Sequence, residues 1–109
     1  MENLTYEEEK ILKALGPGEE NAITYKALAW RVNLPDREVR LTVAHLVTDH
    51  HICICTTSAG GYFLASNYSE FDHAHRELMA RIKALSRRAR GLRYGWEKIK
   101  KDEQLTLGV

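Results

Sequence analysis

The sequence predicts a mainly α protein with one small β-hairpin, an α+β chain that ends in a long helix. Three observations lead to this prediction. Apolar residues recur at helical spacing in three short segments between residues 5 and 50. Isoleucine and cysteine then alternate over 52–55, which is typical of a strand, and a Gly-Gly turn follows. From Phe71 to Ile99 the apolar residues return to helical spacing.

The first two helices have recognisable start and stop signals. Thr5 and Glu8 match a capping box for a helix over 5–15, and Gly16-Pro17-Gly18 ends it. A short extended piece at 22–24 leads to a second helix over 25–32, which Thr24 can cap. Asn33 tolerates the left-handed conformation that a tight helix end requires.

A third helix is expected over about 36–50, because Pro35 fixes φ at a value that suits a helix start. Its core face carries Val39, Val43, Leu46 and Val47. Its opposite face carries Arg37, Leu41, Ala44 and Thr48, with Arg40 at the edge. The hairpin then comprises Ile52–Cys55, a turn at Gly60-Gly61 and a returning strand GYFLA, in which either Tyr62 or Phe63 faces the core.

The chain is expected to divide into a domain at 1–67, a long helix at 68–101, begun by Ser66 or Ser69, and a disordered tail at 102–109. The helix carries an apolar seam with alternating steps of three and four, formed by Ile82, Leu85, Ala89, Leu92, Trp96 and Ile99. A helix of that length spans about 50 Å, more than a domain of this size accommodates. It must therefore protrude, break at Gly91 and Gly95, or pack on another chain, and the seam predicts a homodimer.

Charge is distributed unevenly along the chain. Residues 1–72 carry six Lys/Arg and eleven Asp/Glu, whereas residues 73–101 carry ten Lys/Arg and two Asp/Glu. A basic C-terminal segment favours a polyanion or an acidic partner. The sequence has no apolar run of about 20 residues and no signal peptide, and Cys53 and Cys55 are poorly spaced for a mutual disulfide. We therefore expect a cytoplasmic protein that does not bind membranes.

The segment ITYKALAWRVNLPDREVRLTVAHL, residues 23–46, resembles the winged helix-turn-helix pattern of prokaryotic and phage DNA-binding proteins. The matching positions are Ile23, Thr24, Leu28, Ala29, Val32, Leu34, Arg37, Val39, Arg40, Val43 and Leu46. The hairpin follows at the position of the wing, and the resemblance covers roughly residues 5–80. The sequence departs from the pattern at Asn33, where glycine is usual, and at Pro35, where a serine cap is usual. The resemblance implies sequence-specific binding of double-stranded DNA, as a transcriptional regulator or a phage replication-associated factor.

A helix-turn-helix places its second helix in the major groove, which assigns DNA contacts to the third helix of this chain. Arg37 and Arg40 suit guanine edges or phosphates, and Leu41 and Ala44 suit thymine methyl groups. Thr24, Tyr25 and Lys26, at the start of the preceding helix, suit phosphates. Asp36 and Glu38 weaken the interaction, and Asp36 can instead pair with Arg40 at i, i+4. Additional charge is expected from Arg87, Arg88, Arg90 and Arg93, or from a second copy of the domain.

The same residues bear on three other functions. A protein–protein interaction module on the same scaffold fits the exposed Leu41 and Ala44 and the acidic first half of the chain. A metal-responsive regulator would use His50, His51, Cys53 and Cys55, but their spacing matches no zinc motif and the cysteines fit a strand better, so we predict no metal or other cofactor. The sequence shows no catalytic constellation, so we expect neither an enzyme nor a small-molecule substrate. Trp30 and Trp96 are expected to be packing residues.

Overall fold

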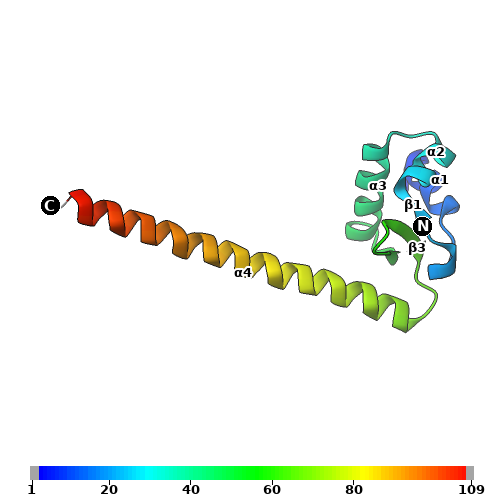
Figure 1. The fold of residues 1–109 in the computed structure, drawn as a ribbon. Helices are drawn as coiled ribbons and strands as arrows, with labels where there is room; N and C mark the ends of the chain where they lie inside the picture. Colours follow the sequence, from blue (N-terminus) through cyan, green and yellow to red (C-terminus); the bar gives the residue numbers. More distant parts are fainter. Residues whose placement is uncertain (1–2, 108–109) are drawn as a thin grey trace. The chain divides into compact units, whose positions relative to one another are not determined.

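A computed structural model describes the backbone of residues 3–107 and the side chains of residues 3–103. The elements follow in the order α1, a single 3₁₀ turn at Glu19–Asn21, β1, α2, α3, β2, β3 and α4 (Figure 1). Internal contacts divide the chain into two units, Met1–Ala74 and His75–Val109, which are described separately below. The fold is mainly α with one small antiparallel sheet, as the sequence predicts.

Helix α1, Tyr6–Ala14, begins at the predicted capping box. The Thr5 hydroxyl accepts a hydrogen bond from the Glu8 backbone N–H at 3.1 Å, and the Glu8 carboxylate accepts one from the Thr5 N–H at 2.8 Å. These two bonds satisfy two of the backbone donors that a helix start leaves free. Ile11 is fully buried on the inner face of α1.

Helices α2, Tyr25–Val32, and α3, Asp36–Thr48, are joined by a tight turn. The Thr24 hydroxyl caps α2 by accepting from the Ala27 N–H at 3.2 Å. Asn33 ends α2 in the left-handed region at φ 57°, as predicted, and Pro35 precedes α3 with φ −60°. The turn therefore fixes the angle at which α3 leaves α2.

The core of the first unit lies between α1, α2 and α3. Its buried members are Ile11, Leu15, Leu28, Ala29, Val32, Val39, Val43 and Leu46. Three of the four valine and leucine residues predicted for the inner face of α3 are among them. Val47 is the exception, because its side chain is 37% exposed at the edge of the helix.

The sheet has three strands in the order β1-β3-β2, all antiparallel. Strand β1 is Ile23–Thr24, β2 is Ile54–Thr56 and β3 is Gly61–Leu64. The hairpin was predicted, whereas the pairing of Ile23 with Tyr62 was not. Gly61 is closely packed, because an added Cβ would lie 3.2 Å from the Ala22 Cβ and 3.1 Å from the Thr57 hydroxyl.

The alternation of isoleucine and cysteine places the two residue types on opposite faces of the chain. Ile52 and Ile54 pack against the helical core. Cys55 is buried on the other face, where its thiol donates weakly to the Glu70 carbonyl at 3.8 Å, and Cys53 is exposed. The first turn of α4 therefore contacts the sheet at Cys55. The first unit extends to Ala74 rather than to residue 67.

Helix α4 runs from Tyr68 to Leu107 without a break at Gly91 or Gly95 (Figure 1). Asn67 caps it by accepting from the Glu70 N–H at 2.9 Å, in place of the predicted serines. Glu70 in turn accepts from the backbone N–H groups of Ser66 and Glu19, each at 2.8 Å. The helix also extends beyond the predicted end at residue 101, so residues 102–107 are helical rather than a disordered tail, and residues 108–109 lie outside the described range.

Within the described residues, no helix is both long enough and apolar enough to cross a membrane.

Candidate nucleic-acid interface

The start of α2 and the exposed side of α3 meet through Tyr25 and Arg40. The Arg40 guanidinium lies over the Tyr25 ring, with its Cζ 4.0 Å from the ring centroid. This cation–π contact favours a position of the guanidinium beside the ring and leaves its N–H groups available to acceptors. Two of the residues predicted from the helix-turn-helix pattern are thus in direct contact.

Tyr62 on β3 belongs to the same cluster, although the sequence did not single it out as a site residue. Burial raises the pKa of the Tyr62 hydroxyl, the nearby Arg40 charge opposes that rise, and Tyr25 adds to it. Tyr62 is half-buried, whereas its neighbour Phe63 is buried. The only sequence signal for Tyr62 was the alternation along the strand. That alternation indicates which face of the strand a residue lies on, but it does not show that Arg40 of α3 lies nearby.

The outer face of α3 presents the predicted contact residues to solvent. Arg37, Arg40, Leu41 and Ala44 are all exposed, Leu41 by 55%. They lie within two turns of the helix, and this spacing matches the reach of a recognition helix across a few base pairs. Thr24 and Lys26 are exposed at the start of α2. The Thr24 hydroxyl already accepts the capping bond, but a hydroxyl can also donate.

The acidic side chains on α3 do not hold these arginines. Within residues 3–103, no ion pair joins Asp36 to Arg40. The alternative i, i+4 pair is therefore absent, and Arg40 contacts Tyr25 instead. Arg37 and Arg40 are available to a ligand, while Asp36 and Glu38 still reduce the local positive potential.

The hairpin tip is uncharged and locally ordered. The Thr57 hydroxyl accepts from the Gly61 N–H at 2.9 Å, and the Thr57 carbonyl accepts from the Gly60 N–H at 3.0 Å. Gly60 has φ 85°, which favours glycine at this turn. With Ser58 and Ala59 exposed, the tip offers only hydroxyl and backbone groups to a partner.

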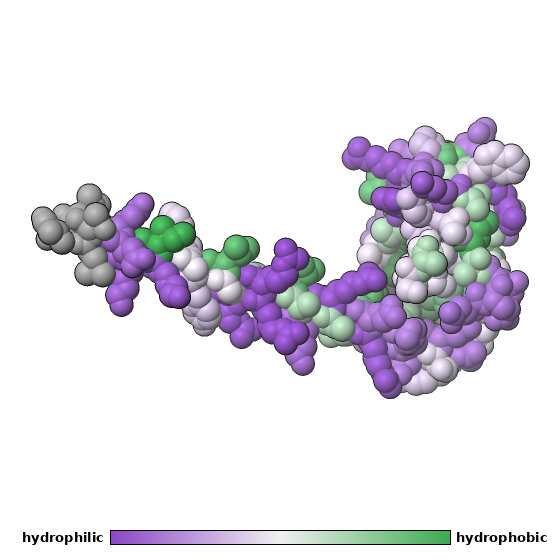
Figure 2. All heavy atoms as spheres, viewed as in Figure 1, coloured by the Kyte–Doolittle hydropathy of each residue, from purple (hydrophilic) through white to green (hydrophobic). Residues whose placement is uncertain are grey.

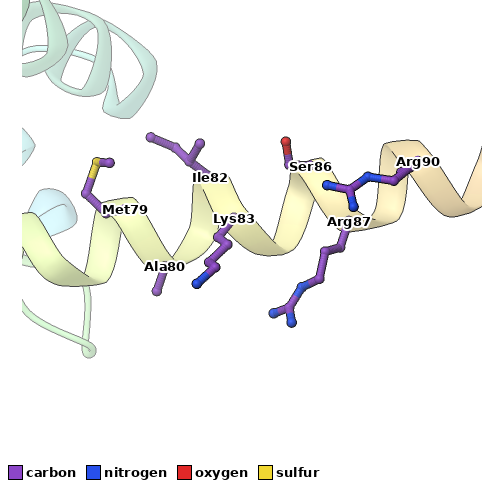
Figure 3. Close-up of a pocket in the computed structure, with 7 residues that line it drawn as sticks. All are labelled: Met79, Ala80, Ile82, Lys83, Ser86, Arg87 and Arg90. Carbon is purple, nitrogen blue, oxygen red and sulfur yellow. The ribbon is translucent and has the colours of Figure 1, made fainter.

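The second unit carries the remaining predicted residues, all on α4. Arg87 and Arg88 are exposed, as are all six seam residues from Ile82 to Ile99. Figure 3 shows Met79, Ile82 and Ser86 on one side of the helix and Lys83 and Arg87 pointing to the other. Around Gly91 and Gly95 a shallow depression is lined by Leu92, Trp96, Ile99 and Arg88. The hydrophobic positions alternate with hydrophilic ones along α4 in Figure 2.

Trp30 does not have the packing role expected of it, whereas Trp96 belongs to the predicted seam, where its packing would be on a second copy. Trp30 on α2 is 87% exposed and Trp96 on α4 is 60% exposed. The cause at Trp30 is its position on α2, since Leu28, Ala29 and Val32 fill the inner side of that short helix. Within the described part of this chain neither indole is enclosed by other side chains.

A second cluster lies in the first unit, where α1 packs against α3. It contains the buried Glu8 together with His45 and His50. The sequence predicts only a capping role for Glu8, and it groups His50 with His51 and the cysteines. The Glu8 cluster depends on contacts between segments that are distant in the sequence, so spacing along the chain could not predict it.

The buried cysteine lies outside this cluster. Burial raises the pKa of the Cys55 thiol to about 11, so that thiol stays protonated at neutral pH.

No family model, no curated protein and no solved structure matches this chain. Three helices followed by a hairpin of a small three-stranded sheet are compatible with a winged helix. The resemblance to that family therefore depends on the residues of 23–46 and on this arrangement of elements.

Proposed function

We propose that this protein binds double-stranded DNA through α3 and the start of α2, as a regulator or replication-associated factor of prokaryotic or phage type. The observation that carries the proposal is the Arg40 guanidinium held over Tyr25, beside an exposed Arg37 on the outer face of α3. A pre-positioned guanidinium loses less side-chain freedom on binding, so it favours a bidentate contact with guanine or phosphate.

The charge of the first unit limits how tightly one copy binds. Residues 1–72 carry a surplus of five acidic groups, and the hairpin tip adds no cation. Affinity for DNA depends on the number of phosphates that are neutralised. The proposal therefore includes a contribution from the basic residues of α4, Arg87 and Arg88 among them, or from a second copy.

Fluorescence anisotropy with labelled random duplex DNA at low salt tests the proposal. Replacing Arg37 and Arg40 together with alanine should weaken binding strongly, and it should lower the slope of log affinity against log salt by about 0.9 for each phosphate that is no longer neutralised. Lys13→Ala, an exposed cation on α1 outside this surface, is the matched control. Equal affinities for the double variant and for the control would refute binding through α3.

We also propose that α4 mediates homodimerisation. The six seam residues are exposed in a single copy, and Gly91 and Gly95 lie beside them with only open space where a Cβ would be. Two glycines inside a helix cost about 1 kcal/mol each relative to alanine, and no packing within the described chain offsets that cost. A close approach by a second helix would use the missing side chain of Gly95, which lies at the edge of the seam.

Positive charges beside the seam are expected to weaken such a dimer. In a parallel pair, Arg88 of one copy would face Arg93 of the other across the seam, and these like charges repel. Sedimentation should therefore show more dimer at high salt than at low salt, opposite to the salt dependence of DNA binding. Arg88→Glu should strengthen the dimer, and Arg87→Glu, farther from the seam, should change it less. A 12.5 kDa monomer at tens of micromolar protein under all these conditions would refute homodimerisation.

A protein–protein interaction module is the second candidate function, favoured by the exposed Trp30 and Leu41. Tryptophan is enriched among the residues that dominate protein interfaces. The anisotropy experiment separates the two functions, since an interaction module predicts no duplex binding at low salt. Trp30→Ser should leave DNA affinity unchanged if α3 is the DNA-binding surface.

A further inference from the structure

The buried carboxylate of Glu8 lies where α1 meets the C-terminal end of α3 and the loop that follows. Glu8 is 3% exposed and is the one buried charged residue in the described part of the chain. Its Oε1 accepts from the Thr5 backbone N–H at 2.8 Å, and this bond holds the pKa of Glu8 below its ordinary value. Oε2 accepts no hydrogen bond and is enclosed by protein. A buried anionic oxygen without such a partner is costly unless a positive charge compensates it.

Two imidazole nitrogens approach that oxygen. Nε2 of His50 lies 3.2 Å from Oε2, and Nε2 of His45 lies 3.4 Å from it. Neither contact has hydrogen-bond geometry, although both are close enough for an ion pair. The ligand atoms of the three residues all lie within 4.8 Å of one another. Three groups that bind metals therefore lie close together.

The two nitrogen–oxygen separations fit neighbouring ligands of a tetrahedral metal site. Zinc binds histidine nitrogen and carboxylate oxygen at about 2.0–2.1 Å, so neighbouring ligands of a tetrahedron are about 3.3 Å apart. The two measured nitrogen–oxygen distances bracket that value. A site of two imidazoles and one carboxylate is also a ligand set that zinc uses when its fourth position is left to water.

Asp49 supplies a further feature of such sites. Its Oδ2 lies 2.5 Å from Nδ1 of His45, on the far side of the ring from Glu8. A carboxylate that accepts from one ring nitrogen holds the proton there, which leaves the lone pair of the other nitrogen free for a metal. His45 is half-exposed and His50 is one-fifth exposed, so an ion can enter from solvent, with Glu8 forming the closed side.

We propose that Glu8, His45 and His50 bind one zinc-class divalent cation, which links α1 to the end of α3. Nitrogen ligands favour zinc, cobalt or nickel over magnesium and calcium, which prefer sites made only of oxygen. The cation neutralises the buried Oε2 and fixes the end of the helix that carries Arg37 and Arg40. The site itself does not depend on DNA binding and is tested without it.

The experiment uses the tag-free full chain, stripped of metal with a chelator. Zinc affinity is measured by competition with a chromophoric chelator, and the melting temperature is recorded with and without zinc. All variants carry Cys53→Ser, because Cys53 is the exposed thiol and could bind zinc independently. Circular dichroism of the metal-free proteins checks that each variant folds.

Four substitutions divide the cluster by role, and a fifth serves as the control. His45→Gln and His50→Gln each remove a ligand and should lower zinc affinity at least a hundredfold. Asp49→Asn removes only the support of His45 and should lower it about 10–100-fold. Glu8→Gln keeps a capping side chain, so its loss of zinc affinity is separable from loss of the cap. His51→Gln is the matched control, since this neighbouring exposed histidine is outside the cluster and the variant should bind zinc as the parent does.

Stoichiometric binding by the parent, lost in the His45 and His50 variants and kept in the His51 variant, supports the proposal. Free zinc at about a hundred times Kd should then raise the melting temperature by roughly 10 °C. Magnesium at the same concentration should leave it unchanged. The proposal is overturned if the Cys53→Ser protein fails to compete with the chelator, or if His50→Gln binds zinc as tightly as His51→Gln does.

Discussion

The two units of this chain are stabilised in different ways. Residues 3–74 bury ten apolar side chains and one carboxylate and have a helix cap at each of α1 and α2. From His75 to Glu103 no described side chain is buried, and α4 presents large apolar residues such as Leu92, which is 76% exposed. The first unit has what a small domain needs to fold by itself. The second has the sequence of a helix whose apolar face requires a partner.

The same comparison applies to charge. The unit that carries the candidate recognition helix is acidic, whereas the helical unit is basic. Cations gathered around a small core would repel one another and destabilise it. Their location on α4 avoids that repulsion within the first unit. The properties of one unit should therefore change independently of those of the other, and this expectation can be tested by mutation.

The largest effect is expected in the core. Leu46 is fully buried between the helices, so Leu46→Ala should lower the free energy of unfolding by about 2–5 kcal/mol. Leu92→Ala on α4 removes the same atoms from an exposed site and should leave the unfolding of the first unit unchanged. Urea denaturation followed by circular dichroism measures both. A large loss of stability in the Leu92 variant at low protein concentration would show that the units are not independent.

The next effect concerns the two glycines of α4. Replacing Gly91 and Gly95 together with alanine should stabilise the helix of a single copy by about 2 kcal/mol, because each glycine costs about 1 kcal/mol in a helix interior. The methyl group at position 95, at the edge of the seam, would separate two closely packed helices, whereas position 91 faces away from the seam. Thermal melting at low concentration should therefore show a more stable helix, and sedimentation at high concentration should show less dimer. An increase in both would contradict a close approach at the glycines.

A smaller effect is expected at the start of α2. Thr24→Ala removes the hydroxyl that accepts from the Ala27 N–H and should cost about 1 kcal/mol of stability. Thr24→Ser keeps that acceptor and serves as the control, with near-parental stability. Loss of DNA affinity in the alanine variant without loss of stability would indicate that the hydroxyl contacts DNA rather than only capping α2.

The smallest effect is the pH dependence that Glu70 contributes. The backbone N–H of Ser66, followed by that of Glu19, holds the pKa of Glu70 below its ordinary value. The ionised form is thus favoured in the folded state, and its contribution is present above about pH 4.3, the usual pKa of glutamate. It is lost as the pH falls through the lowered pKa. The difference in melting temperature between the parent and Glu70→Gln should shrink toward zero below about pH 4, and a constant difference would contradict the assignment.

Local signals in the sequence predicted local structure well. Four helix ends lie where expected: the starts of α1, α2 and α3 and the end of α2. Each is determined by residues within a few positions of it, namely Thr5 with Glu8, Thr24, Pro35 and Asn33. The alternation at 52–55 likewise placed isoleucine and cysteine on opposite faces. In each case the interacting groups are neighbours along the chain, so spacing alone was sufficient.

Contacts between distant segments were not predictable in this way. Spacing allowed Arg40 to pair with Asp36 at i, i+4, but it could not reveal the contact that Arg40 makes with Tyr25. The meeting of Glu8 with His45 and His50 depends on how α1 packs on α3, and no periodicity in one segment reports it. The exposure of Val47 and Trp30 has a similar origin. Whether an apolar side chain is buried depends on which neighbouring elements pack against it, and the spacing within one helix does not show this.

The exposure of Trp30 and Trp96 gives each unit its own optical reporter. The chain has two tryptophans, one on α2 and one on α4, and both indoles are mostly in contact with water. Emission from Trp96 should shift to shorter wavelength when the seam becomes covered, whereas Trp30 should respond to a ligand that covers α2. Because Trp30→Phe and Trp96→Phe each silence one reporter, fluorescence can follow events on the acidic and basic units separately, in one cuvette and without an attached dye.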